Sequence, residues 1–207
     1  MHRAARGVAG VRLLLASQSE TRRKMLEAAG VPFECVAAPL DEEEAKAGLA
    51  AAGFEPRDMA EMLAEMKAKS VVAAADALVI GADQVLELDD GTMLSKPASR
   101  EEAHEQLRRL GGATHYLHSA AAIAENGERV WGETESVALD VRPLSEAFLK
   151  AYLDAEYEAV RWNVGGYRVE GPGAQLFDEI DGSHFAVLGL PLLPLLAYLR
   201  ERGVLKS

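Results

Sequence analysis

Two long runs that read as β-strands, Thr114 to Glu125 and Glu128 to Val141, are joined by the dipeptide Asn126-Gly127. Asn-Gly between such runs is the strongest short-range sequence signal for a β-hairpin, because the tight turn needs residues that tolerate positive φ. The middle of the chain is therefore expected to contribute an antiparallel region to a sheet.

The segments on either side of this hairpin have a different order. Before it, the apolar run Leu13 to Ala16 predicts a buried strand, Ser17 to Thr21 a polar turn, and the residues up to Gly30 a helix. After the hairpin we expect a helix, a strand and a closing helix. This order predicts an α/β fold with a mixed, curved sheet flanked by helices, in two lobes around a central cleft.

The other elements follow from apolar periodicity and from Gly, Pro and Ser signals. A glycine-rich loop is expected over Gly165 to Gly173. Further strands are predicted at 33–37, 78–80 with a continuation over 85–88, and 175–180, and further helices at 56–75, 99–110, 145–158 and 192–202. Residues 1–10 are predicted to form a flexible N-terminal extension, and residues 11–207 a single domain.

Composition narrows the classes of function. Of the 207 residues, 49% are hydrophobic and 27% charged, and the net charge of −11 argues against a general nucleic-acid binder. The one cysteine, Cys35, is expected in the core and fits a reducing cytoplasm. The longest apolar run, Phe185 to Leu199, is too short to span a bilayer, so neither a membrane segment nor a membrane partner is expected.

The strand–turn–helix segment from Leu13 to Gly30 is suited to binding an anion. A helix N-terminus offers backbone N–H groups and the positive end of the helix dipole. Two hydroxyls and three cations lie close together in this segment, namely Ser17, Ser19, Arg22, Arg23 and Lys24. We interpret the segment as a phosphate-binding corner, with solvated surface cations as the alternative.

Three further polar clusters interrupt apolar runs. Asp83 follows a short strand and Gly81-Ala82, a place for a general base or metal ligand at a sheet edge, although a turn aspartate that caps its own backbone is the simpler reading. The acidic run Asp41 to Glu44 offers a carboxylate to a hard metal, or it is a helix start. Lys96 is held extended by Pro97 and could reach a phosphate, or it is solvated.

His115 and His118 are three apart in an expected strand, which places them on opposite faces, so a zinc site is rejected. Walker, dinucleotide-binding and G-x-S-x-G patterns do not occur in the sequence.

In their order along the chain, the clusters resemble the Maf-like family of nucleoside triphosphate pyrophosphatases. The resemblance rests on L-A-S-x-S-x-x-R-R-x-x-L, F-E-C…D-E, G-A-D-Q, K-P, G-Y-x-x-E-G-x-G-x-x-L-F and G-L-P-L, and it covers Leu13 to Leu199. It implies a Maf/ITPase-like fold and hydrolysis of non-standard nucleoside triphosphates to a monophosphate and pyrophosphate. It also implies a homodimer.

The resemblance also assigns roles to residues. Asp83 would be the general base that activates water, and Glu42 would help to hold a divalent metal, Mg²⁺ or Mn²⁺. Substrate-binding roles are implied for Ser17, Ser19, Arg22, Arg23, Lys67 and Lys96. Cations on the phosphate oxygens and a hard metal suit attack on a phosphoryl centre.

Specificity for the base is implied at Thr21, Gln84 and Glu170. Gln84 and Glu170 resemble the residues found at these places in the branch of the family that acts on 7-methyl-GTP. A carboxylate such as Glu170 could accept hydrogen bonds from the N1–H and amine of guanine, and its charge would favour a cationic methylated base. Thr21 stands where that branch tends to have an aromatic residue. A dTTP/UTP pyrophosphatase is the alternative, and another is a low-turnover nucleotide-binding regulator of cell division or septation.

The chain also departs from the family pattern at several positions. These departures are Glu20, Met66, Ser95, Ser183 and Ala186.

Overall fold

The computed structural model describes residues 10–75 and 77–206. The predicted N-terminal extension lies outside the described residues except for Gly10. The chain divides into two compact units, one made of the residues up to Gln84, Ser119–Glu135 and the residues from His184 on, the other of Val85–His118 and Ser136–Ser183. The single domain expected over 11–207 stays a prediction.

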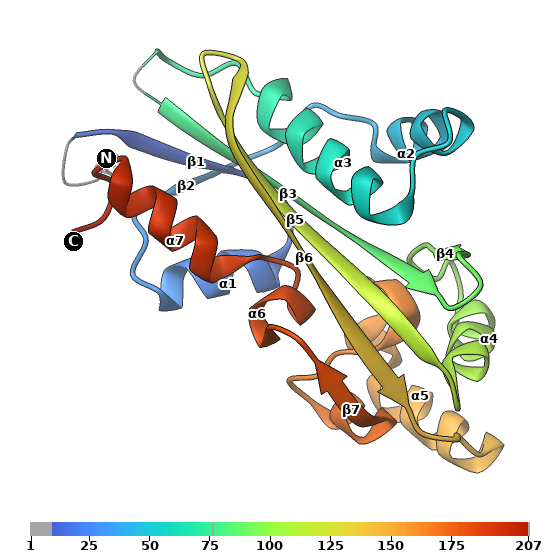
Figure 1. Ribbon diagram of the computed structural model, residues 1–207. Helices are drawn as coiled ribbons and strands as arrows, with labels where there is room; N and C mark the ends of the chain where they lie inside the picture. The colour runs from blue at the N-terminus through green and yellow to red at the C-terminus, as the bar shows by residue number, and fades with distance from the viewer. Residues whose placement is uncertain (1–9, 76, 207) are drawn as a thin grey trace. The chain divides into compact units, whose positions relative to one another are not determined.

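The strands and helices expected from the sequence follow one another in the expected order (Figure 1). Three further elements occur at Glu42–Ala51, Met93–Leu94 and His184–Val187. The strands are β1 (Arg12–Ala16), β2 (Glu34–Val36), β3 (Ala77–Leu88), β4 (Met93–Leu94), β5 (Thr114–Glu125), β6 (Glu128–Val141) and β7 (Phe177–Asp181). The helices are α1 (Glu20–Ala28), α2 (Glu42–Ala51), α3 (Pro56–Ser70), α4 (Arg100–Leu110), α5 (Glu146–Val160), α6 (His184–Val187) and α7 (Leu192–Glu201), with 3₁₀ turns η1 (Val164–Gly166) and η2 (Pro172–Leu176).

The strands form a seven-stranded sheet in the order β2-β1-β3-β5-β6-β7, and β4 pairs with β3. β1 runs parallel to both β2 and β3, whereas β6 and β7 are antiparallel. The mixed α/β sheet flanked by helices is thus confirmed (Figure 1). Asn126 and Gly127 connect β5 to β6 with φ of 53° and 80°, the backbone that the Asn-Gly signal predicts.

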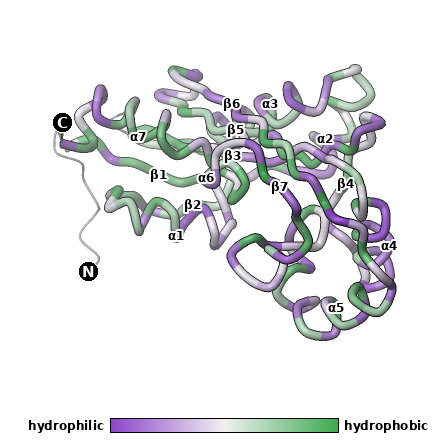
Figure 2. Tube along the Cα trace, turned by 60° about the horizontal axis from the view of Figure 1, so that its bottom comes forward, coloured by the Kyte–Doolittle hydropathy of each residue, from purple (hydrophilic) through white to green (hydrophobic). Residues whose placement is uncertain are grey.

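Strands β1 and β3 place apolar side chains on both faces of the sheet. Leu13 and Leu15 belong to a core cluster with Ile80 and with Leu195 and Leu199 of α7. Their neighbours in sequence, Leu14 and Ala16, pack in a second cluster with Ala77 and Val79. A parallel strand that is covered on both faces reads as a continuous apolar run, which is the pattern of β1 (Figure 2).

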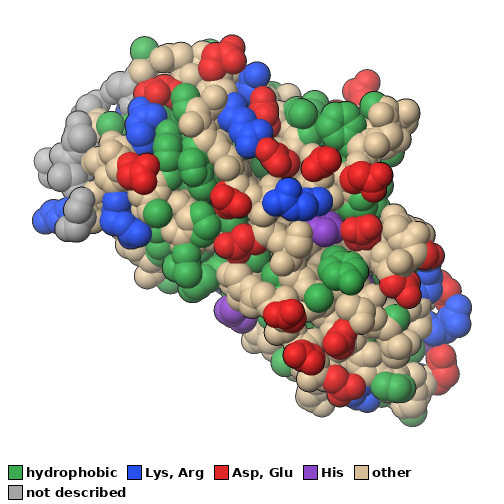
Figure 3. Space-filling model, viewed as in Figure 1, with side chains coloured by type: hydrophobic (Ala, Val, Ile, Leu, Met, Phe, Trp, Pro, Cys, Tyr) green, Lys and Arg blue, Asp and Glu red, His purple; other side chains and the backbone are tan. Residues whose placement is uncertain are grey.

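Charged side chains of both signs lie on the surface. On the face shown in Figure 3, Asp and Glu are interspersed with Lys and Arg. Within residues 10–75 and 77–206, the helices are too short or too polar to cross a membrane.

The predicted boundaries were wrong in places. Gly81 to Gln84 do not end a strand, because β3 continues through them from Ala77 to Leu88. The helix predicted over 56–75 ends at Ser70, where the β-branched Val71 is extended with φ −88° and ψ 118°. Cys35 is exposed rather than in the core, because β2 is a three-residue edge strand.

Other boundaries moved by a few residues. The predicted turn at 17–21 is shorter, since α1 begins at Glu20, and the strand predicted at 33–37 is trimmed to Glu34–Val36. The glycine-rich segment contains the end of η1 and the start of η2, and the strand predicted at 175–180 begins only at Phe177.

Gly81 allows α3 to lie directly against β3. A Cβ atom at Gly81 would overlap the carbonyl oxygen of Ala64 and lie 2.5 Å from the backbone nitrogen of Ala68. Both of these atoms belong to the backbone of α3, so they cannot move aside as a flexible side chain would. The close approach is therefore specific to glycine.

We expect Gly81→Ala to destabilise the protein by about 1–3 kcal/mol, the usual cost of overpacking. Gly48 in α2 is the matched control, since nothing lies within 4 Å of a Cβ there. Gly48→Ala should leave the free energy of unfolding unchanged or raise it by up to about 1 kcal/mol. Urea unfolding of both variants measures the difference, and equal stabilities would contradict the close contact.

In the second unit, β5 buries a histidine in an aromatic cluster. His115 is 0% exposed, its Nε2 lies 2.7 Å from the Tyr167 hydroxyl, and its ring packs near Phe177. Nδ1 of His115 is buried without a hydrogen-bond partner among the described residues. Burial lowers the pKa of His115 from 6.5 to about 4, because this surrounding disfavours the imidazolium.

This shift predicts loss of stability in acid. Between pH 6.5 and about 4 the unfolded chain binds a proton at His115 that the folded chain does not. The contribution of His115 is thus fully present above pH 6.5, and about 3 kcal/mol is lost as the pH falls through 4. Urea unfolding at pH 7 and pH 4.5 should show a smaller loss for His115→Gln than for the wild type, whereas His104→Gln should behave like the wild type.

Candidate active site

The N-terminus of α1 is capped by hydroxyls. Ser19 is the N-cap residue, and its Oγ accepts a hydrogen bond from the backbone N–H of Arg22 at 3.4 Å. Oγ of Ser17 accepts from the backbone N–H of Ser19 at 3.2 Å. The two predicted substrate-binding serines therefore shape the turn between β1 and α1, and each hydroxyl keeps its proton to donate to a ligand.

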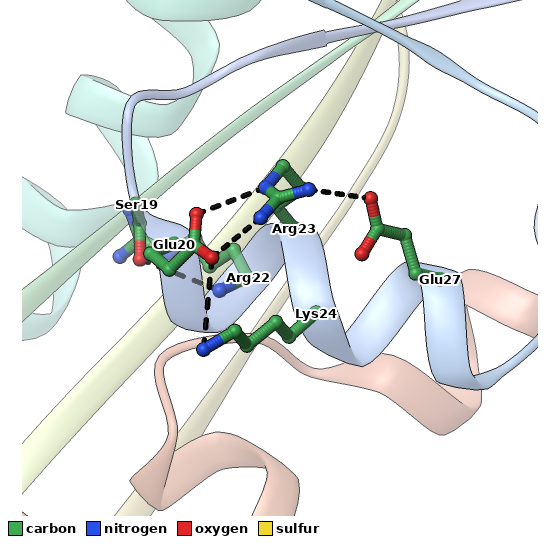
Figure 4. Close-up of polar contacts among 6 residues, drawn as sticks. All are labelled: Ser19, Glu20, Arg22, Arg23, Lys24 and Glu27. Carbon is green, nitrogen blue, oxygen red and sulfur yellow. Dashed lines mark hydrogen bonds and ion pairs between the residues drawn. The ribbon is translucent and has the colours of Figure 1, made fainter.

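The excess of cations in the first turn of α1 is balanced by acids on the same helix (Figure 4). Nε of Arg23 donates to Glu20 at 2.9 Å and Nη1 to Glu27 at 2.8 Å, and Lys24 lies 3.6 Å from Glu20. The hydrogen bond from Arg23 lowers the pKa of Glu20. Glu20, a departure from the family pattern, therefore stabilises this turn as an acid near the helix N-terminus.

Arg22 points the other way, into the protein. It is 9% exposed, its Nε donates to the carbonyl oxygen of Gly189 at 2.7 Å, and its Nη1 donates to that of Ala82 at 3.0 Å. Burial lowers the pKa of the guanidinium, and the negative charges of Asp83 and Glu42 oppose that shift. The positive charge of Arg22 therefore interacts with the negative charges of Asp83 and Glu42.

A buried lysine joins those two acids. Lys67, 4% exposed on α3, places Nζ 2.6 Å from Oδ1 of Asp83 and 3.0 Å from Oε1 of Glu42. Asp83 is also 4% exposed, and its Oδ2 is buried without a hydrogen-bond partner among the described residues. A carboxylate held by one oxygen and open at the other is suited to accept a proton or to bind a hard cation.

The place of Asp83 in the sheet differs from the prediction. It lies inside the central strand β3 rather than past a strand end at a sheet edge. However, the parallel neighbour β1 ends at Ala16, opposite Gly81. Asp83 is therefore two residues beyond the carboxyl end of the adjacent parallel strand, and α3 covers it through the close approach at Gly81.

Gln84 is anchored by its side-chain amide. Nε2 lies 2.9 Å from the Ser119 hydroxyl, 3.1 Å from the carbonyl oxygen of Ala186 and 3.0 Å from that of Val187. Ser119 in turn donates to Ala186 O at 2.6 Å. Sequence reasoning missed Ser119, since nothing local to β5 marks it. At position 186 only the backbone carbonyl takes part, so the alanine there keeps this contact.

The remaining predicted residues are Thr21, Lys96 and Glu170. Thr21 is half-buried in α1. Lys96 and Glu170 are both exposed and belong to the second unit, in the loops before α4 and before η2. Direct contacts therefore join Glu42, Lys67 and Asp83, and the charges of the two acids also act on Arg22. The roles predicted for Thr21, Lys96 and Glu170 stay predictions.

The site combines a buried acid that has a free oxygen with two buried cations, on a mixed α/β sheet. Such groups suit hydrolysis at a phosphoryl centre. Residues 12–202 match the model of the family described as Maf-like protein, and the chain belongs to this family. The family resemblance of the sequence is thus confirmed.

Relatives in two bacteria carry the name nucleoside triphosphate pyrophosphatase. The protein of Sphingopyxis alaskensis is 47% identical over 193 residues, which are 93% of this chain and 98% of that protein. The protein of Caulobacter vibrioides is 49% identical over 191 residues, 92% of this chain and 96% of that protein. A solved Ham1 protein of Staphylococcus aureus aligns with 63% of this chain and 71% of its own at 12% identity, with a TM-score of 0.40.

Proposed function

We propose that the protein is a nucleoside triphosphate pyrophosphatase, which hydrolyses its substrate to a nucleoside monophosphate and pyrophosphate. The observation that carries the proposal is the buried contact of Lys67 with Asp83, which leaves Oδ2 of Asp83 without a partner. The names of the relatives at 47% and 49% identity support the same reaction.

In this proposal Asp83 acts as the general base. Oδ2 accepts a proton from water while the water oxygen forms a bond to the α-phosphorus and the bond from that phosphorus to the bridging oxygen breaks. Pyrophosphate leaves with the electron pair of that bond. Lys67 fixes the orientation of Asp83 through Oδ1, and its ammonium and the guanidinium of Arg22 place positive charge beside the base.

The residues present fit a hard divalent cation, Mg²⁺ or Mn²⁺. The described residues contain no cluster of three or more His, Cys, Asp or Glu side chains that would form a complete protein site. Magnesium commonly takes one or two carboxylates and completes its shell with substrate phosphates and water. The carboxylate of Glu42 would supply a protein ligand, which leaves Oδ2 of Asp83 free to accept the proton, and the cation would neutralise charge on the triphosphate.

The proposed base is a modified purine such as 7-methylguanine. Gln84 uses its amide hydrogens on acceptors within the protein, so the group that it offers a ligand is its carbonyl oxygen. Glu170 is exposed and adds carboxylate acceptors. Guanine presents donors at N1 and at its exocyclic amine, which suit a carbonyl or a carboxylate acceptor, and the negative charge of a glutamate favours a cationic methylated base.

A panel of nucleotides with Mg²⁺ or Mn²⁺ tests substrate and base together. We expect kcat/KM for 7-methyl-GTP to exceed that for dTTP and UTP by roughly 10- to 100-fold, with GTP between them. Glu170→Gln should lower the value for 7-methyl-GTP about tenfold, whereas Glu158→Gln, also exposed in the second unit, should leave it unchanged.

Two results would contradict parts of this proposal. A preference for dTTP or UTP would overturn the assignment of the base and leave the reaction intact. Nucleotide binding without release of pyrophosphate, seen as a raised Tm alone, would favour the low-turnover regulator instead.

We also propose that the enzyme acts as a cytoplasmic homodimer. Light scattering after size-exclusion chromatography tests the oligomeric state.

A further inference from the structure

A second group of polar side chains lies in the second unit and includes none of the residues of the candidate active site. It comprises Glu87 of β3, His118 of β5 and Ser136 of β6, which are neighbouring strands of the sheet. Nδ1 of His118 lies 2.8 Å from Oγ of Ser136, and Nε2 lies 2.7 Å from Oε2 of Glu87. The histidine therefore connects a hydroxyl on one side to a carboxylate on the other.

The contact with Glu87 decides which way the other hydrogen bond runs. A carboxylate only accepts hydrogen bonds, so Nε2 of a neutral His118 carries the proton that it donates to Glu87. Nδ1 is then unprotonated and accepts the hydrogen bond of the Ser136 hydroxyl. A hydroxyl that donates to an imidazole, which is itself oriented by a carboxylate, is the arrangement of a nucleophile, its base and a positioning acid.

The three side chains differ in their exposure to solvent, and a nucleophilic site needs an accessible hydroxyl beside a shielded base. His118 is 6% exposed, the side chain of Glu87 is 25% exposed, and Ser136 is exposed to solvent. Tyr116, two residues before His118 on the same face of β5, is 39% exposed, and its ring stacks at 14° to the imidazole. The base is thus shielded, the hydroxyl is accessible, and an aromatic surface lies beside them.

We propose that Ser136 is an activated nucleophile that accepts the acyl group of small aryl esters, with His118 as its base and Glu87 as a positioning residue. Oγ of Ser136 forms a bond to the carbonyl carbon, and its proton moves to Nδ1 of His118. The bond from that carbon to the phenolic oxygen breaks, and the leaving phenolate takes the proton back from Nδ1. Tyr116 provides a surface on which the aryl group stacks.

The test uses the full-length protein and p-nitrophenyl acetate. The release of p-nitrophenolate measures the rate of acylation, and peptide mass spectrometry locates the acetyl group. We expect acetylation of Ser136, and none in Ser136→Ala. Ser145 is an internal control, because it is also exposed in this unit but caps α5 by accepting from Phe148 N and has no histidine partner.

Glu87→Gln separates a reactive serine from a structural hydrogen-bond network. The glutamine amide can donate to Nε2, which would place the imidazole proton on Nδ1 and remove the acceptor for Ser136. The acylation rate should fall roughly 100-fold, the scale of lost general-base catalysis, with little change in Tm. Glu105→Gln, an exposed acid on α4 that pairs with Arg108, is the matched control and should keep the full rate.

Acetylation of Ser136 no faster than that of Ser145 would overturn the proposal, as would an acylation rate that Glu87→Gln leaves unchanged. Either result would mean that Ser136 and Glu87 serve only to satisfy the buried His118. Pyrophosphate release by the same variants is an independent measure of folding, since these residues have no role in the proposed nucleotide reaction.

Discussion

Asp83→Asn is expected to reduce the release of pyrophosphate by a factor of roughly 10²–10⁴, the contribution typical of a general base. Asparagine has nearly the same shape and can still accept the hydrogen bond from Lys67, but its amide cannot take a proton from water. The loss should therefore appear in kcat, measured as pyrophosphate released from 7-methyl-GTP under saturating conditions, while nucleotide binding measured by calorimetry persists.

Asp89→Asn is the control for this experiment, because Asp89 is an exposed acid that follows the same strand, β3, by one residue. Its activity should equal that of the wild type. Activity of Asp83→Asn within a few-fold of the wild type would exclude Asp83 as the base and would shift that role to another acid. A loss of binding together with activity would instead assign Asp83 to holding the substrate.

The second large effect is expected at Lys67. Lys67→Met removes the cation that neutralises Asp83, a side chain that is 4% exposed. Breaking a buried ion pair leaves an uncompensated charge, which costs about 3–5 kcal/mol. We expect a loss of this size in the free energy of unfolding from urea titration at pH 7, together with a large loss of pyrophosphate release.

A double-mutant cycle shows whether the unpaired charge is the cause. In Lys67→Met combined with Asp83→Asn no buried carboxylate is left at position 83, so the double variant should be more stable than Lys67→Met alone. Lys69→Met, two residues along α3, is the control, because its ion pairs are exposed and contribute less than about 1 kcal/mol. Strictly additive effects of the two substitutions would contradict a direct interaction.

Much of the secondary structure could be predicted because its signals are local. The bounds of β5 and β6 agree with the prediction, since the apolar character of each run and the Asn-Gly turn are properties of a few neighbouring residues. The same holds for α4, whose N-cap Ser99 accepts from the backbone of Glu102 as a residue of that type does at a helix start. The order of the motifs also sufficed to place the chain in its family.

Errors arose where a long-range contact overrides a local signal. Gly81 is a strand breaker by propensity, and a strand end was predicted there. In the folded chain the missing side chain is what lets the backbone of α3 pack against β3, so the strand continues through Asp83. Similarly, the alternation around Cys35 predicts burial, but an edge strand with one neighbour leaves the thiol exposed.

The sequence by itself determined the family, the identity of the candidate base and acids, and most of the elements that carry them. Only the tertiary structure decided which groups meet. Lys67 and Asp83 are 16 residues apart, Gln84 and Ser119 are 35 apart, and Glu87 and His118 are 31 apart. The physical reason is that periodicity and capping depend on neighbours within a few residues, whereas these contacts depend on strand order and on how closely a helix approaches the sheet.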